Sequence, residues 1–301
     1  MSRTLSEIGE FGLIRQLQKT IVKSKNVIKG IGDDTAVLPG EPGKYLLFTT
    51  DMIAEGTHFT KNTKPEEIGH KALACNISDV AAMGGVPSYG VVSIGLPSNK
   101  SIRDVRRIYS GIDCLARKFN VNIVGGDTIK SDKVVINIAL LGEVKKNDLV
   151  TRGGAKVGDW IVVTGPLGRS LKTGKHLNFI PRLAESKFLI KHCKPNAMID
   201  ISDGLAGDLG HILEESRTGA VIYEDFIPKT EGATGKEALY DGEDFELLFT
   251  VSPAKIKRLL GLKTRFWFYP IGQIVKAQAG LTFIDGKKKP HRLSAKSFTH
   301  F

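Results

Sequence analysis

The chain has 301 residues, 41% of them hydrophobic, and a formal net charge of +11. This length suits two domains or one large domain with a full core. No apolar run approaches the roughly 18 residues of a membrane span, and the basic residues are dispersed without interleaved aromatic side chains, so we expect neither a membrane protein nor a nucleic-acid binder. Three widely spaced cysteines without a CxxC pair favour free thiols and a cytoplasmic location.

The first half of the chain alternates helical and strand patterns. Apolar residues at helical spacing from Leu5 to Ile21 predict a first helix. Ser101 is placed to cap a helix whose apolar stripe ends at Phe119. The other elements predicted in this half are strands at 45–51, 89–96, 121–127 and 133–144 and a helix at 64–85.

A glycine-rich stretch begins near residue 150 and precedes a new strand. We therefore expect one domain over residues 1–148 and a second over residues 149–301. Strands and helices mix in both halves, which predicts an α/β or α+β fold in two layers. The elements predicted in the second half are strands at 160–164, 220–223 and 245–251, helices at 182–192, 204–217 and 253–260, and two terminal strands.

Acidic residues end or flank many of the apolar segments. Each one, taken alone, is explained as well by a turn or a helix cap as by a functional role. Together they share glycine or hydroxyl neighbours, and an oxygen-rich set without His or Cys suits Mg²⁺ and a phosphate substrate. The acids are Asp33, Asp34, Asp51, Asp79, Asp127, Asp200, Asp203, Glu243 and Asp244.

Asp79 is the sharpest case, because its helix neighbours are almost all apolar. A carboxylate there needs a cation or a hydrogen-bond network. No conventional phosphate-binding loop accompanies these acids. The stretch 174–177, "GKHL", has the wrong glycine spacing, and His176 stands where Ser or Thr is required. Arg152, beside two glycines, remains a candidate phosphate clamp.

Several motifs resemble the thiamine-monophosphate kinase family, in the superfamily that includes aminoimidazole ribonucleotide synthetase. They run in the family's order over nearly the whole chain: "GIGDDTAVL", "TTDMIAEGTHF", "HKALACNISDVAAMGG", "GGDT", "LVTRGGAKVGDWIVVTG", "IDISDGLAGDLGHI", "GEDFELLFT" and the terminal "SFTHF". The resemblance implies an α+β fold of two domains. The N-terminal α+β domain would build a β-barrel across a homodimer, and the C-terminal domain would be α/β.

The resemblance also implies roles for individual residues. The metal ligands, for several Mg²⁺ ions, would be Asp34, Thr49, Thr50, Asp51, Asp79, Asp127, Asp200 and Asp203. Tyr109, Gly126, Asp127, Arg152 and Ser202 would contact ATP, and His58, Glu243 and Phe298 would contact thiamine phosphate. Asp33 would support its neighbour. The shortness and basic character of the segment 165–194 leave its role as a lid open.

The implied reaction transfers the γ-phosphate of ATP to thiamine monophosphate in line, without a dedicated catalytic base. The acceptor phosphate, with a second pKa of about 6, is mostly dianionic at neutral pH. The alternatives are an ATP-dependent synthetase of the same superfamily acting on a purine precursor and a non-catalytic nucleotide- or nucleic-acid-binding protein. "GEDFEL" argues against the former, and the lack of a basic stripe argues against nucleic acid.

Overall fold

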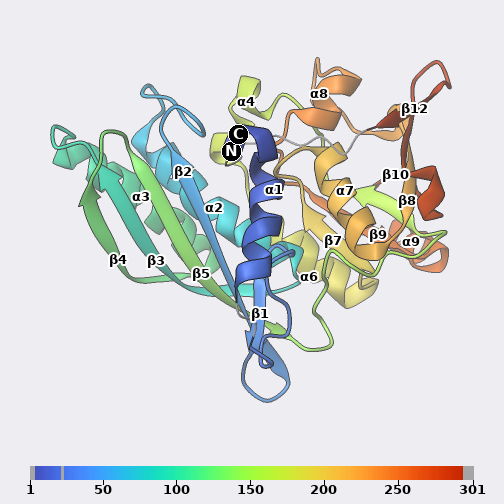
Figure 1. Cartoon of the computed structure of the whole chain (residues 1–301), viewed down its shortest axis with the longest axis horizontal. Helices are drawn as coiled ribbons and strands as arrows, with labels where there is room; N and C mark the ends of the chain where they lie inside the picture. Colours follow the sequence, from blue (N-terminus) through green and yellow to red (C-terminus); the bar gives the residue numbers. More distant parts are fainter. Residues whose placement is uncertain (1–3, 22–23, 294–301) are drawn as a thin grey trace.

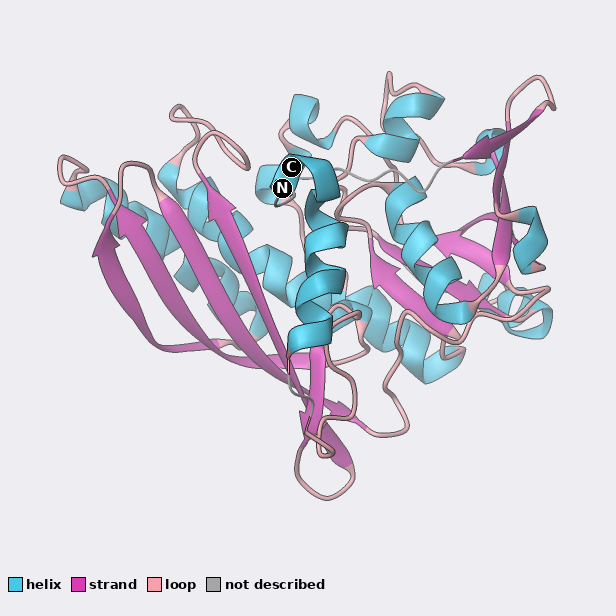
Figure 2. Cartoon of the chain, in the orientation of Figure 1, coloured by secondary structure: helices cyan, strands magenta, loops and turns pink. Residues whose placement is uncertain are grey.

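The computed structural model describes residues 4–21 and 24–293. Each half of the chain forms its own sheet, and helix α1 (Leu5–Thr20), which is kinked at Gly9, lies over the junction between the two halves (Figures 1 and 2). Helices and strands mix in both halves, which confirms the expected two-domain fold of mixed α and β content. Within the described residues, no helix combines the length and the apolar character needed to cross a membrane.

The N-terminal sheet has one covered face and one open face. Its strands run in the order β1 (Ala36–Pro39), β2 (Lys44–Ala54), β5 (Val135–Lys145), β3 (Val86–Leu96) and β4 (Asn122–Lys130). Alternate residues of β5 are buried, because that side of the sheet packs against helices α2 (Pro65–Ala82) and α3 (Ile102–Phe119) (Figure 1). The sheet does not close on itself within the described chain, so the barrel across a dimer stays a prediction.

The opposite side of this sheet is left uncovered, and we call it the open face. Large apolar side chains project from it between polar ones, and all of them are more than a third exposed. They are Phe48, Met52, Tyr89, Val91 and Ile129. A water-exposed apolar sheet face of this kind is typical of an interface.

Helices α2 and α3 touch through a reciprocal pair of glycines. A Cβ added to Gly69 on α2 would lie 1.9 Å from the carbonyl oxygen of Ile108, and one added to Gly111 on α3 would lie 2.0 Å from that of Glu66. Both backbones therefore approach more closely than any side chain permits. Helix α2 is buried along most of its length, because it also contacts β2 and β5 of the sheet and two helices of the other half.

The C-terminal sheet carries helices on both faces. Helix α7 (Leu205–Ser216) packs in one apolar core, while α6 (Leu183–His192) and α9 (Pro253–Leu260) pack in the other. The β8–β11 pair is the only parallel one among its described strands. In order across the sheet, the strands are β12 (Pro290–Leu293), β11 (Leu281–Ile284), β8 (Gly219–Tyr223), β10 (Tyr269–Val275), β6 (Trp160–Val163), β9 (Leu247–Val251) and β7 (Ala197–Asp200).

The structure adds short elements that the sequence pattern did not show. After α9 the described residues form three strands, not two, and the extra elements before them are β1, β7, α4 (Ser170–Thr173), α5 (Lys175–Asn178) and α8 (Gly235–Tyr240). Most of them have only four residues, too few for a helical or strand period to emerge. Residues 146–159 connect the two sheets. The boundary between residues 148 and 149 stays a prediction.

Candidate functional site

Four carboxylates from distant parts of the chain meet where the two halves face each other. Asp34 precedes β1, Asp79 lies in α2 and Asp200 ends β7, and one oxygen of each lies within 4.8 Å of the others. Asp51 on β2 points to the covered side of the sheet and lies against Asp79. We call these four residues the acid cluster.

Hydroxyl groups and one guanidinium supply the hydrogen bonds to the acid cluster. Thr49 Oγ1 donates to Asp79 Oδ2 at 2.5 Å, and Ser78 Oγ donates to Asp200 Oδ2 at 2.5 Å. Arg152 donates to Asp34 Oδ1 from Nε at 3.2 Å and from Nη2 at 2.6 Å. The other oxygen of Asp34, Oδ2, is buried and has no hydrogen-bond partner. Such an oxygen indicates a site built for additional positive charge.

Burial and mutual repulsion make the acid cluster hard to ionise. Burial is the largest cause that raises the pKa values of Asp34, Asp51 and Asp200 to about 6. The pKa of Asp79 is raised well above its usual range, first by burial and then by the charge of Asp51. Arg152 only partly offsets these effects at Asp34. A divalent cation among these oxygens would reverse the balance.

Asp33 and Asp34 contact different parts of Arg152. Asp33 Oδ1 accepts the backbone N–H of Arg152 at 3.0 Å, while Asp34 binds the guanidinium. Asp33 Oδ2 also lies 3.5 Å from Lys29 Nζ. Asp33 thus fixes the backbone that carries the arginine, and Asp34 reaches the acid cluster. This arrangement explains why two adjacent acids stand in this turn.

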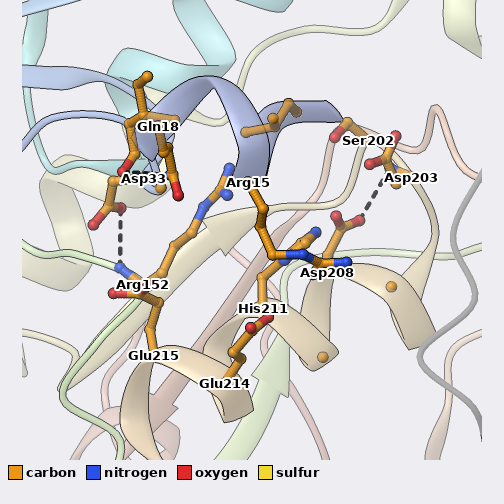
Figure 3. Close-up of a pocket in the computed structure, with 15 residues that line it drawn as sticks. Arg15, Gln18, Asp33, Arg152, Ser202, Asp203, Asp208, His211, Glu214 and Glu215 are labelled. Atoms are coloured by element: carbon orange, nitrogen blue, oxygen red, sulfur yellow. Dashed lines mark hydrogen bonds between the residues drawn. The ribbon is translucent and has the colours of Figure 1, made fainter. Parts of the chain in front are cut away.

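A cavity of about 600 Å³ opens beside the acid cluster, and we call it the larger cavity (Figure 3). Arg15 of α1 and His211 of α7 lie on its walls. Arg152, Ser202 and Asp203 line it as well, so two of the residues expected to contact ATP face the same space. Its volume falls in the range of about 300–1,000 Å³ that is usual for small-molecule sites.

Asp208 on α7 is an acid of this cavity that the sequence analysis missed. It is almost fully buried, and its Oδ2 accepts the backbone N–H of Asp203 at 3.1 Å. Burial first, and then the charge of Asp203, raises its pKa well above the usual range. The signal that singled out Asp79, an acid inside an apolar helix, is present here too, in "LAGDLGHI".

A smaller cavity of about 220 Å³ adjoins the larger cavity and shares Ser202 and Asp203 with it. His58, Glu243 and the acid-cluster residue Asp51 also line it. Two residues expected to contact thiamine phosphate therefore face one space. The two cavities meet beside the acid cluster.

Left-handed backbone conformations place Glu243 at the smaller cavity. The φ angles are 70° at Gly242, 55° at Glu243 and 50° at Phe245. The N–H of Glu243 donates to the carbonyl of Ser202 at 2.6 Å, and that of Phe245 donates to the carbonyl of Ile201 at 2.7 Å. Strained backbone of this kind persists where the surrounding structure enforces it, and it concentrates at functional sites.

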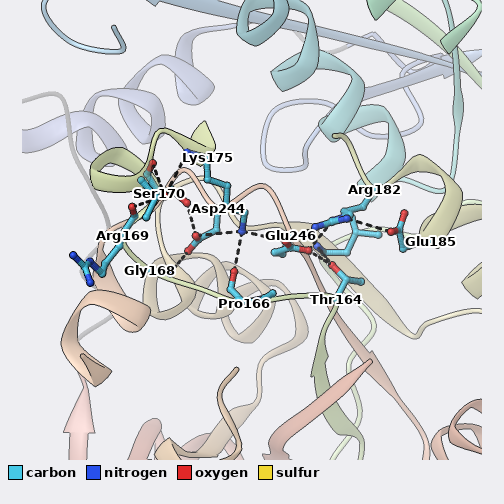
Figure 4. A network of polar contacts seen from close by, with 12 residues as sticks. Thr164, Pro166, Gly168, Arg169, Ser170, Lys175, Arg182, Glu185, Asp244 and Glu246 are labelled. Carbon is cyan, nitrogen blue, oxygen red and sulfur yellow. Dashed lines mark hydrogen bonds and ion pairs between the residues drawn. The ribbon is translucent and has the colours of Figure 1, made fainter. Parts of the chain in front are cut away.

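Two further acids of the same motif, Asp244 and Glu246, hold the segment 165–194 in place (Figure 4). Asp244 accepts hydrogen bonds from the backbone N–H of Gly168 at 2.9 Å and from Ser170 Oγ at 2.6 Å. Glu246 is fully buried and binds Arg182 through two hydrogen bonds, at 2.7 and 2.6 Å. The segment is thus anchored through buried charges.

Lys71 and His176 also contact Glu243, although neither was expected to have a function. Lys71 on α2 forms an ion pair with Glu243 Oε2, and His176 Nδ1 lies 3.0 Å from the same oxygen. Lys71 carries the signal of a charged residue inside an apolar helix, in "GHKALAC". His176 carries none, because its short helix shows no period.

The remaining expected ligands lie elsewhere in the described chain. Thr50 is on the open face, and Asp127 shares that side of the sheet on the edge strand β4. Strand β4 is three strands from β2, or roughly 14 Å at the usual spacing. Gly126 is also on β4, and Tyr109 is on α3, so a single chain does not bring them to the acid cluster. Phe298 lies outside the described residues.

Nearly the full length of the chain is similar in sequence to known proteins. The model of the AIR synthase related protein N-terminal domain matches residues 32–144, and that of the C-terminal domain matches residues 156–283. Thiamine-monophosphate kinase of Buchnera aphidicola (subsp. Acyrthosiphon pisum) is 37% identical, over 97% of this chain and 98% of that protein. The Aquifex aeolicus protein of the same name is 34% identical over 99% of each, and the Escherichia coli one 33% over 97% and 98%.

Solved structures show the same relationship. The structure described as "AaThiL complexed with AMPPCP and TMP" superposes with a TM-score of 0.87 at 32% identity and full coverage of both chains. Thiamine monophosphate kinase from Aquifex aeolicus gives 0.79 at 31% identity, over 95% of this chain and 99% of that chain. A hydrogenase maturation protein HypE in complex with ATP shares the fold, with a TM-score of 0.70 at 20% identity over 83% and 84%.

Proposed function

The chain belongs to the thiamine-monophosphate kinase family of AIR synthase related proteins, and from this membership we propose that it transfers the γ-phosphate of ATP to thiamine monophosphate. The products are thiamine diphosphate and ADP. The observation that carries the proposal is the acid cluster beside the junction of two cavities, one for each phosphorylated ligand. A synthetase acting on a purine precursor is not favoured, because the relatives at 33–37% identity are thiamine-monophosphate kinases.

The acid cluster fits Mg²⁺. Its donors are all oxygens, one of them is a buried carboxylate oxygen without a partner, and burial and mutual repulsion raise its pKa values. We assign as Mg²⁺ ligands the four carboxylates, the neighbouring Asp203 and the hydroxyl of Thr49. When bound, Mg²⁺ neutralises the phosphates and helps to align them for in-line transfer.

The acceptor occupies the smaller cavity in this proposal. His58 and Glu243 contact thiamine monophosphate there, with Phe298 as a third contact from the C-terminal motif. The acceptor phosphate has a second pKa of about 6 and is mostly dianionic at neutral pH. The residues around it therefore need to orient and screen the phosphate, and no base has to remove a proton.

The triphosphate of ATP lies along the larger cavity, where Arg152 and Ser202 contact it. Arg152 arrives pre-oriented, because Asp33 and Asp34 hold its backbone and its guanidinium. A fixed guanidinium loses little entropy when it binds phosphate, and it supplies charge where the transferred group passes.

A homodimer completes the site in this proposal. Tyr109, Gly126 and Asp127 lie on elements away from the acid cluster, and the side chain of Thr50 is on the opposite side of the sheet from Thr49 and Asp51. The exposed apolar side chains of the open face support pairing with a second copy, which would bring the β4 edge of each chain to the cluster of the other. The barrel implied by the family resemblance has this geometry.

The test is an assay of purified protein with ATP and Mg²⁺, in parallel with thiamine monophosphate and with free thiamine. We expect thiamine diphosphate and one equivalent of ADP from the monophosphate alone. Diphosphate formed from free thiamine, or none formed from the monophosphate, would rule out the proposal.

A further inference from the structure

Lys71 is a buried lysine whose ammonium group lies among three polar partners. Its side chain is 0% exposed. The ammonium donates to the carbonyl oxygen of His58 at 2.9 Å and to Glu243 Oε2, and Nδ1 of His176 lies 3.0 Å from both the ammonium and Glu243 Oε2. With its proton on Nδ1, His176 donates to the same carboxylate oxygen as Lys71, so the lysine and the histidine both hold Glu243. Such a network is rigid, because any displacement leaves a buried charge unpaired.

His176 reaches this network because its segment is anchored. It lies in α5, within the segment 165–194, and Asp244 and Glu246 bind that segment on either side of it in sequence. The same six-residue motif, "GEDFEL", therefore contributes Glu243 to the cavity and holds the histidine that contacts Glu243. Helix α2 contributes Lys71 from the other side.

The network acts on a group that faces the acceptor. Glu243 lines the smaller cavity and its side chain is 20% exposed, whereas Lys71 is fully buried and lines neither of the two cavities. Burial works against ionisation of Glu243, but contacts with His176 and Lys71 outweigh it and lower the pKa of this carboxyl group. A carboxylate held by one oxygen is fixed in orientation toward whatever enters the cavity.

We propose that Lys71 and His176 are positioning residues for Glu243, which hold its carboxylate in the orientation that binds the acceptor and so govern acceptor affinity. This inference rests on the proposed function, since it names what sets the affinity of the acceptor site. Neither residue touches the acid cluster or the larger cavity in the contacts described above. Their effect is therefore confined to the acceptor.

The test is a double-mutant cycle with Lys71→Met, which keeps the length of the side chain, and Glu243→Gln. We expect Lys71→Met to raise KM for thiamine monophosphate by roughly tenfold to a hundredfold, the effect of losing one charge-assisted hydrogen bond. KM for ATP should change by less than about twofold. In the Glu243→Gln background, Lys71→Met should add almost nothing, because the lysine acts through the glutamate.

His176→Gln keeps the inference testable if Lys71→Met does not fold. It should raise KM for thiamine monophosphate, again without effect on KM for ATP. Lys44→Met, which removes a lysine paired with Glu143 away from both cavities, is the matched control and should leave all constants unchanged.

Additive effects in the double mutant, or equal rises in KM for ATP and for thiamine monophosphate, would overturn the positioning role. These outcomes are distinct from failure of the proposed function, in which the wild-type protein itself would not convert thiamine monophosphate. The wild-type assay therefore precedes the cycle.

Discussion

The carboxyl group of Asp79 has the most unfavourable charge in the acid cluster. It is half-buried on an apolar helix, faces Asp51, Asp34 and Asp200, and receives one hydroxyl hydrogen bond. Asp79→Asn keeps the shape and removes the charge, so we expect loss of activity together with a melting temperature, in EDTA, near or above that of the wild type. The measurements are the kinase assay and a thermal melt.

Asp113→Asn is the matched control, because Asp113 is an exposed acid on α3 that pairs with Arg117. It should change neither activity nor melting temperature. If Asp79→Asn instead lost several degrees of stability and kept its activity, Asp79 would be a structural residue, not a metal ligand.

The raised pKa values predict a specific dependence of stability on pH. An acid whose pKa is higher in the folded state binds more protons there than in the unfolded state, so the free energy of unfolding falls as pH rises between the two values. For Asp200 this window runs from about 4, the unfolded pKa, to about 6 in the folded protein. Without metal, this residue should therefore stabilise the fold less at neutral pH than at about pH 4.

The measurement is urea unfolding in EDTA across this window, for the wild type and for Asp200→Asn. The difference between them is the informative quantity, because His211, whose pKa burial lowers to about 4, acts in the opposite sense. We expect the wild type to lose more stability than the variant as pH rises, and Mg²⁺ to restore it at neutral pH. If the free energies of unfolding of the wild type and of the variant changed with pH in parallel, the pKa of Asp200 would not be raised in the folded protein.

Sequence reasoning finds charged residues inside apolar helices, because they break a visible pattern. Asp79 was identified in this way, and Lys71 and Asp208 carry the same signal. What the sequence does not contain is the pairing. Nothing near residue 71 indicates that its partner is Glu243, because that contact depends on how two domains pack. The pairing of Arg152 with Asp34 is hidden for the same reason.

At the scale of elements, the segment 165–194 depends on Glu246. This residue is fully buried, and it balances Arg182 and Lys175, with Thr164 donating a further hydrogen bond at 2.7 Å. Glu246→Gln removes the fully buried charge that Arg182 and Lys175 share and leaves them only their longer contacts with Glu185 and Asp244, so we expect a loss of about 3 kcal/mol in the free energy of unfolding. Urea unfolding measures the loss, and proteolysis should cut first within this segment.

Glu143→Gln serves as the comparison, since Glu143 and its partner Lys44 form an exposed pair on the N-terminal sheet, away from this segment. Surface pairs contribute little, so its stability should stay close to that of the wild type. If both variants behaved alike, the anchoring role of Glu246 would be wrong.

The long elements follow from the sequence, whereas the short ones do not. Helix α3 and strand β5 carry a clear helical stripe and a strict alternation. Strand β7 has only four residues, all buried, and its apolar run leads directly into the acid at its end. Its pairing with β9 is a long-range contact that local pattern does not encode. The order of the seven-stranded sheet is unreadable for the same reason.

At the scale of the whole molecule, a shared site makes a sharp prediction about mixed dimers. Asp79→Asn and Asp127→Asn should each abolish activity when alone. If the β4 edge of one chain serves the acid cluster of the other, a mixed dimer of the two variants contains one site with both aspartates intact. Mixing the inactive proteins under conditions that allow subunit exchange should therefore restore activity, up to about one quarter of the wild-type value for random exchange.

The outcome separates the two arrangements. If Asp79 and Asp127 served the same site within one chain, every site in the mixture would keep one defect, and activity would stay absent. Sedimentation of each variant checks that both still assemble.

The glycine contact between α2 and α3 fixes the position of α2, which carries residues of two different parts of the site. Lys71 stands two residues beyond Gly69, and Asp79 stands ten beyond it, so one helix carries both the proposed support of the acceptor site and a proposed ligand of the cation. A methyl group added at Gly69 or Gly111 would push α2 away from α3. It would displace Lys71 and Asp79 together, although it would touch neither side chain. The close approach of the backbones at Gly69 and Gly111 thus fixes where α2 lies and, with it, the positions of both side chains.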